Sequence, residues 1–169
     1  LGDRLGEVVL GAAPGQTVVG DSTSVLLYKL IRAAVDADSS RTEIVGDRAN
    51  FPTDRFLLQG IAAARGLALR WLRPDRAAGV RPSDLAEALS DRTALVVLSH
   101  VAYRSGSLAD AEAITRMTHD AGALILWELT DDDPVIDLSV FKNRTWLIST
   151  LSLGLMFGLF FGNIVLTPL

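Results

Sequence analysis

Residues 93–99, TALVVLS, decide the fold class of this chain. A continuous apolar run of this kind is typical of a parallel strand that is buried on both of its faces. A helical pattern follows over residues 108–120, and a second apolar run at residues 123–127 predicts the next buried strand. Strands that alternate with helices predict right-handed crossovers and a mainly parallel sheet that is covered by helices on both sides.

The chain before residue 93 shows the same alternation. Apolar and β-branched runs predict three more short strands, at residues 17–19, 43–45 and 67–72. Apolar residues at helical spacing predict three more helices, at residues 25–35, 56–66 and 82–89. We therefore expect an α/β fold with a mainly parallel sheet over residues 1–127.

The composition argues against several classes of function. Sixteen Lys and Arg residues stand against twenty Asp and Glu residues, and the net charge of −4 argues against a protein that binds nucleic acid electrostatically. The chain has no Cys, which excludes disulfides and thiolate metal sites, and its two His residues leave little for a metal cluster. We expect no metal site and no nucleic-acid partner in this chain of 169 residues.

The last part of the chain differs from the rest, because residues 146–169 carry no charged side chain. At about 1.5 Å per residue, a helix of this length spans roughly 36 Å, which is enough to cross a bilayer. Small residues recur every four positions from Thr150 to Gly162, and such a stripe lets another helix approach closely in a membrane. We expect a polar linker at residues 128–145 and a transmembrane helix at residues 146–169. The alternative is a helix buried in a soluble core.

Polar segments stand where predicted strands end, at residues 21–24, 51–54 and 100–106. Parallel α/β sheets bind ligands outside the carboxyl ends of their strands, so these segments are the candidate site. Residues 20–24, GDSTS, open a helix and offer hydroxyls, free N–H groups and the positive end of a helix dipole, which suits a phosphate. An ordinary Ser/Thr helix cap is the alternative interpretation.

Two further segments carry candidate ligand-binding groups. Residues 50–54, NFPTD, offer an aromatic face for a planar ring and a carboxylate nearby, or else a turn with a buried Phe. His100 and Tyr103 are candidate acid–base or ligand-orienting groups, or else structural residues of a loop.

Residues 1 to about 127 resemble the kynureninase family of pyridoxal-phosphate enzymes, which have fold type I. The resemblance rests on LGDRLGEVVLGAAPGQTVVGDSTSVLLYKL (1–30), NFPTDRFLLQGIAA (50–63), ALVVLSHVAYRSGSLADAEAIT (94–115) and HDAGALILWEL (119–129). It implies part of the large domain of a fold type I transferase and pyridoxal 5′-phosphate as cofactor. It also implies hydrolysis of L-kynurenine to anthranilate and L-alanine, a homodimer and a cytoplasmic location for the parent enzyme.

The resemblance assigns cofactor contacts residue by residue. Thr23 and Ser24 match the phosphate-binding pair of the family, and Phe51 matches the aromatic residue that stacks on the pyridine ring. The remaining residues of that loop are Pro52, Thr53 and Asp54. Tyr103 matches a loop that borders the site.

The sequence departs from the family where the chemistry is most demanding. Glu128 replaces the Asp that pairs with the pyridinium nitrogen, and Asp131 replaces a His near the ring. The longer Glu128 is expected to misplace its carboxylate by about an ångström, a shift that costs on the order of 10²-fold in rate. The two lysines, Lys29 and Lys142, do not match the Tyr-Lys motif that carries the Schiff-base lysine. We therefore assign no catalytic residue and expect weakened cofactor binding and no turnover.

From Trp127 onward the sequence WELTDDDPVIDLSVFKNRTWLISTLSLGLMFGLFFGNIVLTPL resembles a loop and a transmembrane helix of the fourteen-helix drug:proton antiporters of the major facilitator superfamily. Lys142 and Arg144 directly before the apolar run favour a cytoplasmic flank. We expect an inactive fragment of a kynureninase-like hydrolase. The alternatives are a membrane-anchored fusion remnant without catalysis, produced by joining two coding sequences near residue 127, and a non-functional product that misfolds.

Overall fold

The computed structural model of the chain describes residues 1–20 and 22–129, and residues 1–129 form one compact unit. Within them lies a parallel sheet with the strand order β2-β1-β3-β4. The strands are β1 (Glu43–Asp47), β2 (Ala68–Leu72), β3 (Thr93–Ser99) and β4 (Leu124–Glu128). The α/β class with a mainly parallel sheet, which the sequence predicts, is confirmed.

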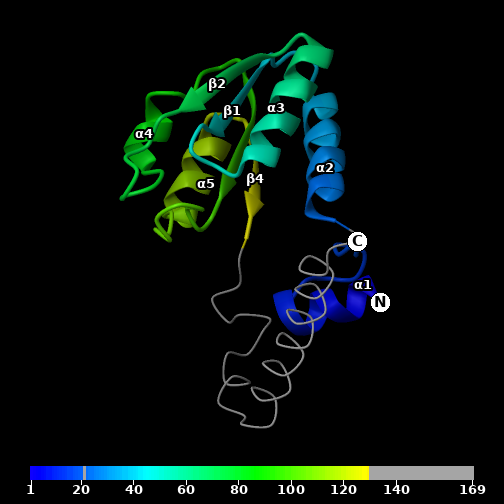
Figure 1. Cartoon of the computed structure of the whole chain (residues 1–169). Helices are drawn as coiled ribbons and strands as arrows, with labels where there is room; N and C mark the ends of the chain where they lie inside the picture. The colour runs from blue at the N-terminus through cyan, green and yellow to red at the C-terminus, as the bar shows by residue number, and fades with distance from the viewer. Residues whose placement is uncertain (21, 130–169) are drawn as a thin grey trace, which may run out of the picture. The chain divides into compact units, whose positions relative to one another are not determined.

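Helices cover both faces of the sheet (Figure 1). One face is covered by α2 (Thr23–Ala37) and α3 (Pro52–Arg65), and the other by α4 (Pro82–Ala86) and α5 (Ala111–Asp120). Two short helical segments, α1 (Gly2–Leu5) and the π-helix η1 (Gly6–Leu10), come first in the chain.

The two faces of the sheet build two separate apolar cores, because successive side chains of a strand point to opposite faces. Ile44 of β1 packs with the cluster that contains Leu27 and Ile31 of α2. Its neighbour Val45 packs with the opposite cluster, which contains Leu85 and Ile114. Ile31, Ile44, Val45, Leu85 and Ile114 are all completely buried. Full burial of each such side chain stabilises the fold by about 1.5–3 kcal/mol.

The structure differs from the sequence-based prediction at residues 17–19, which form no strand. Val18 is 80% exposed and Val19 is 53% exposed, so the β-branched run has no sheet to pack against. A run of this kind forms a strand only when it pairs with a neighbour and buries one face.

Several helix boundaries also differ from the prediction. Helix α2 covers Thr23–Ala37 rather than residues 25–35, and α4 ends at Ala86 rather than near residue 89. Capping explains two further differences. Helix α3 begins at Pro52 rather than at Phe56, because the fixed φ of proline suits the first helical position. Helix α5 begins at Ala111 rather than at Leu108, because the Asp110 side chain accepts a hydrogen bond from the Ala113 N–H at 3.0 Å.

The strand order places a topological switch point between β1 and β3. The chain passes from β1 to β2 on one side, and it then crosses over β1 to reach β3 on the other side. Ligands of open α/β sheets bind at the carboxyl edge of such a point. Helix α2 begins at the same edge at which β4 ends, the lower edge in Figure 1. The topology therefore brings the start of α2, the loop after β1 and the end of β4 to one edge.

Several sequence-based expectations lie outside the described residues. They concern Asp21, the part of the expected linker that follows Leu129, and the expected transmembrane helix at residues 146–169. Within residues 1–20 and 22–129, no helix is both long and apolar enough to cross a membrane.

Candidate functional site

The loop after β1 presents an aromatic ring at the carboxyl edge of the sheet. Phe51 precedes Pro52, the first residue of α3, and its side chain is 48% exposed. The interpretation of this segment as a turn with a buried Phe is therefore wrong. Phe51 contacts Tyr103 in a T-shaped arrangement, with 5.3 Å between the ring centroids and 89° between the ring planes. The structure thus brings together two aromatic candidates that are far apart in the sequence.

A polar network lies beside this aromatic pair and links the ends of three strands. The Ser99 hydroxyl at the end of β3 donates to Glu128 Oε2 at 2.7 Å and lies 3.0 Å from Asn50 Oδ1. The Asn50 amide donates in turn to Asp54 Oδ2 at 3.2 Å. Asn50 and Asp54 are both buried. Two candidate residues, Asp54 and Glu128, are therefore connected through two residues that the sequence analysis did not single out.

The environment of Asp54 favours its protonated form. Burial raises the pKa of Asp54 to about 6, and the negative charge of Glu128 adds to this rise. Among the described residues, no Lys, Arg or His nitrogen lies within 4.0 Å of either carboxylate. The network is therefore a pair of carboxyl groups whose hydrogen-bond partners, among the described residues, are neutral, and the pKa of Asp54 is about 6.

The hydroxyls proposed to bind a phosphate lie at the start of α2. Ser22 caps this helix of 15 residues by accepting a hydrogen bond from the Val25 N–H at 3.2 Å. Thr23 is exposed and Ser24 is partly buried in the first turn. Because Ser22 serves as the cap, the hydroxyls of Thr23 and Ser24 are not needed for that role. A helix start with these hydroxyls suits an anion.

Other candidates have mainly structural surroundings. Pro52 and Thr53 are partly buried in the first turn of α3 and shape the loop that presents Phe51. His100 packs against Trp127 in a T-shaped arrangement with 6.2 Å between the ring centroids. Lys29 is exposed on α2.

The structure does not join all the candidates into one contact network. Among the described residues, no hydrogen bond or ring contact links Thr23 or Ser24 to Phe51, Asp54 or Glu128. They share an edge of the sheet only. No group of three or more His, Asp or Glu residues that could hold a metal ion occurs in residues 1–20 and 22–129.

Sequence reasoning missed Asn50 and Ser99 as members of the network. Asn50 lies directly before the aromatic residue, and Ser99 is the last residue of a buried strand. A polar residue at the carboxyl end of a parallel strand is the signal that identifies both.

We predict that Asp54→Asn stabilises the chain in a pH-dependent way. Below about pH 3 the Asp54 carboxyl is neutral in both the folded and the unfolded state, so the substitution changes the pH-dependent part of the stability little. As the pH rises toward 7, the unfolded chain releases this proton more readily than the folded chain, whose Asp54 pKa is about 6. Wild type then loses stability relative to the variant, by about 3 kcal/mol at pH 7.5. Urea unfolding from pH 4 to pH 8 measures this difference.

The matched control for this prediction is Asp91→Asn, which changes an exposed carboxylate outside the network. Its difference from wild type should stay nearly constant over the same pH range. A difference that does not grow with pH for Asp54→Asn would contradict the assignment of a raised pKa to Asp54.

Comparison with known proteins agrees with this fold. Residues 12–131 match the aminotransferase class-V family. Kynureninases from Burkholderia pseudomallei (strain 1106a) and Pseudomonas fluorescens are 38% and 36% identical to this chain in alignments of 135 residues. These alignments cover 76% of this chain. The chain spans 30% of the length of these curated relatives.

Among solved structures, the apo cysteine desulfurase from Thermococcus onnurineus NA1 has a TM-score of 0.66 at 21% sequence identity. The match covers 75% of this chain and 31% of that chain, and it supports the fold alone. Because the family match covers most of the chain, including every strand of the described sheet, the chain belongs to the aminotransferase class-V family.

Proposed function

We propose that residues 1–129 form the cofactor-binding part of a kynureninase-like enzyme that uses pyridoxal 5′-phosphate. The observation that carries the proposal is the carboxyl edge at the switch point. A half-exposed aromatic ring and a hydrogen-bonded carboxylate lie there, and a helix start with two hydroxyls faces the same edge. The kynureninases among the relatives support the choice of subfamily.

The residues at this edge suit the parts of the cofactor. Thr23 and Ser24, together with the first N–H groups of α2, would hold the phosphate. Phe51 would stack on the pyridine ring, and Glu128 would pair with the ring nitrogen. Pyridoxal phosphate, when bound, supplies an electron sink for bond cleavage next to an amino group.

The buried residues of the site act on orientation rather than on the cofactor itself. Asp54 accepts a hydrogen bond from the Asn50 side chain and so fixes the loop that carries Phe51. Pro52 and Thr53 complete that loop in the first turn of α3. Ser99 holds the Glu128 carboxylate through the bond at 2.7 Å.

The reaction that we propose for the parent enzyme is hydrolysis of L-kynurenine to anthranilate and L-alanine in the cytoplasm, by a homodimer. Within residues 1–169 the lysines are Lys29 and Lys142. Lys29 lies beyond the first turn of α2 and is exposed, which does not suit a covalent anchor for the ring. We therefore propose that residues 1–169 bind the cofactor weakly and do not complete the reaction.

Cofactor binding is measured with pyridoxine 5′-phosphate as the probe. This compound lacks the aldehyde of the cofactor and cannot condense with lysines, so only non-covalent binding is measured. We expect Phe51→Ala to weaken its binding about tenfold, because a stacked aromatic contact contributes roughly 0.5–1.5 kcal/mol. Isothermal titration calorimetry on the full chain measures the change.

The control for this experiment is Phe56→Ala, which removes a 66% exposed ring from α3, the helix that Phe51 precedes. We expect this variant to bind the probe as wild type does. Equal losses for the two variants, or binding that Thr23→Ala with Ser24→Ala leaves unchanged, would contradict the assignment of the site.

We expect the chain to catalyse no turnover of L-kynurenine. The full chain incubated with pyridoxal phosphate and L-kynurenine should give no anthranilate above the rate without protein, because Lys29 lies away from the site and Lys142 does not match the lysine motif of the family. Anthranilate fluorescence measures the product sensitively, and an active kynureninase of full length serves as the positive control. Steady formation of anthranilate by the chain would overturn the proposed lack of activity.

We propose in addition that residues 146–169 anchor the chain in a membrane, with residues 130–145 as the polar linker. Glu128, which the sequence-based prediction places in the linker, is the last residue of β4. The observation in favour is the uncharged stretch that Lys142 and Arg144 precede, and the antiporter-like sequence makes a fusion remnant the second candidate function. We expect the chain expressed in cells to stay in the membrane fraction at alkaline pH and to need detergent for release. A variant that ends at Leu129 is the control, and release of the full chain by alkali alone would contradict the anchor.

A further inference from the structure

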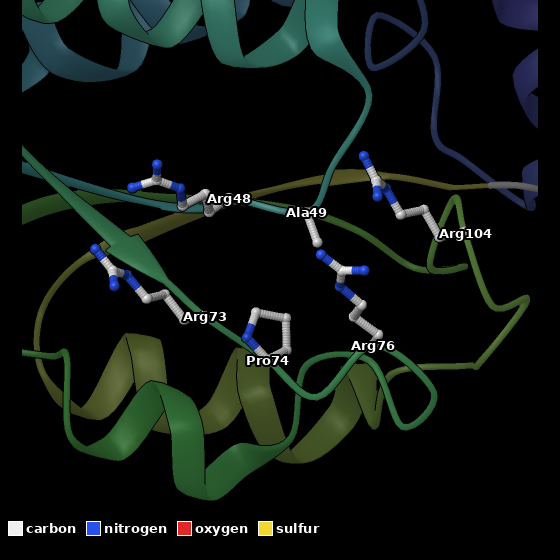
Figure 2. Close-up of a pocket in the computed structure, with 6 residues that line it drawn as sticks. All are labelled: Arg48, Ala49, Arg73, Pro74, Arg76 and Arg104. Carbon is white, nitrogen blue, oxygen red and sulfur yellow. The ribbon is translucent and has the colours of Figure 1, made fainter.

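Four arginines line a cavity at the carboxyl edge that the proposed cofactor contacts do not use. The cavity has a volume of about 370 Å³ and is lined by Arg48, Ala49, Arg73, Pro74, Arg76 and Arg104. Arg48 and Ala49 follow β1, the residues 73–76 follow β2, and Arg104 lies in the loop after β3. Because β2, β1 and β3 are neighbours in the sheet, three loops that are separate in sequence converge here (Figure 2).

No close ion pair within the described residues neutralises the charge of this cavity, although the Asp47 carboxylate attracts Arg104 from a longer distance. All four arginines are exposed, and none of them has a described carboxylate within 4.0 Å. Other arginines of the chain differ in this respect, since Arg65 pairs with Asp36 and Arg70 pairs with Glu43. Four like charges around one small cavity repel each other unless an anion lies among them.

The loops that carry the arginines are held in place before any ligand binds. The Asp47 carboxylate accepts the Ala49 N–H at 2.7 Å and thereby fixes the turn with Arg48. Asp75 does the same for the turn with Arg76, where it accepts the N–H groups of Ala77 and Ala78 at 2.8 and 3.0 Å.

The third loop is closed on itself and tied to the second. The Ala102 N–H donates to the Ser107 carbonyl at 2.8 Å, which closes the loop that carries Arg104. The Ser107 hydroxyl donates to the Ala78 carbonyl at 2.7 Å, which joins this loop to the turn that carries Arg76. A cavity with walls fixed in this way loses little conformational freedom when it binds a ligand.

We propose that this cavity is a binding site for a small polyanion that carries at least two phosphate groups. In Figure 2 the guanidinium groups of Arg48 and Arg73 lie toward one end of the view and those of Arg76 and Arg104 toward the other. A charge that is spread along the cavity in this way fits a chain of phosphates better than a single anion. Guanidinium groups bind phosphate oxygens in pairs of parallel hydrogen bonds.

The lining also indicates which part of a ligand is recognised. Apart from the arginines it consists of Ala49 and Pro74, and it contains no aromatic residue on which a base could stack. Binding should therefore depend on the phosphates, whether they come from inorganic pyrophosphate or from a nucleoside triphosphate.

Calorimetric titration of the full chain with inorganic pyrophosphate tests this proposal. We expect saturable binding that is at least tenfold tighter than binding of inorganic phosphate and that weakens as the salt concentration rises. Arg76→Gln and Arg104→Gln should each weaken pyrophosphate binding about tenfold, and the double variant should weaken it further. The control is Arg116→Gln, which removes an exposed arginine of α5 that does not line the cavity and should leave binding unchanged.

Each result of this experiment has a definite meaning. Equal losses for Arg116→Gln and the cavity variants, or equal affinity for phosphate and pyrophosphate, would overturn the proposal in favour of unspecific attraction. Tighter binding of a single-stranded RNA oligonucleotide than of pyrophosphate, lost in the same variants, would also overturn it. A nucleoside triphosphate that binds as tripolyphosphate does supports recognition of phosphates alone. Pyridoxine 5′-phosphate binding that survives in the cavity variants separates this site from the cofactor site.

Discussion

The pairing of β1 with β3 is the contact on which the rest of the structure depends. β1 lies between β2 and β3, so the crossover to β2 starts from it and the crossover from β2 to β3 passes over it. Ile44 and Val45 of β1, and Val96, the partner of Val45 in β3, are completely buried, and the strand pair takes part in both apolar cores. A parallel pair of this kind forms only when the helices that connect the strands cover both faces. The switch point, the candidate site and the arginine cavity all follow from this one arrangement.

The two ends of this strand pair carry carboxylates in opposite circumstances. At the amino end, Glu43 is buried but lies 3.2 Å from the Arg70 guanidinium and accepts hydrogen bonds from Ser90 and Thr93. Its burial is compensated by these partners, and it ties β1 to β2 and β3. At the carboxyl end, Asp54 and Glu128 have neutral partners within the described residues, and the pKa of Asp54 rises to about 6. A buried carboxyl group with a raised pKa, such as Asp54, is typical of functional sites, whereas a buried carboxylate in an ion pair is often structural.

The sequence predicts those features that depend on local pattern. All four strands of the sheet were expected within two residues of their observed ends, since apolar runs of this length report burial directly. Phe51 was identified because it lies in a short motif next to a strand end. The prediction of a strand at residues 17–19 is wrong, because a strand forms only where a neighbouring strand is available for pairing, and the run itself does not encode that neighbour. The same limit applies to the Asn50–Ser99–Glu128 contacts and to the arginine cavity, which join loops whose neighbours are set by the strand order.

Glu128 shows that tertiary contacts can change an expectation that is based on side-chain length. By side-chain length alone, a Glu in place of an Asp reaches about an ångström further. Ser99 is the direct partner of Glu128 in the β3–β4 register, and its hydroxyl holds Oε2 at 2.7 Å. This bond draws the carboxylate sideways toward β3, so the position of the remaining oxygen, Oε1, depends on Ser99 as well as on the added methylene. The reach of the carboxylate toward a ring at this edge is therefore set by a contact between two strands, and the length of the residue alone does not determine it.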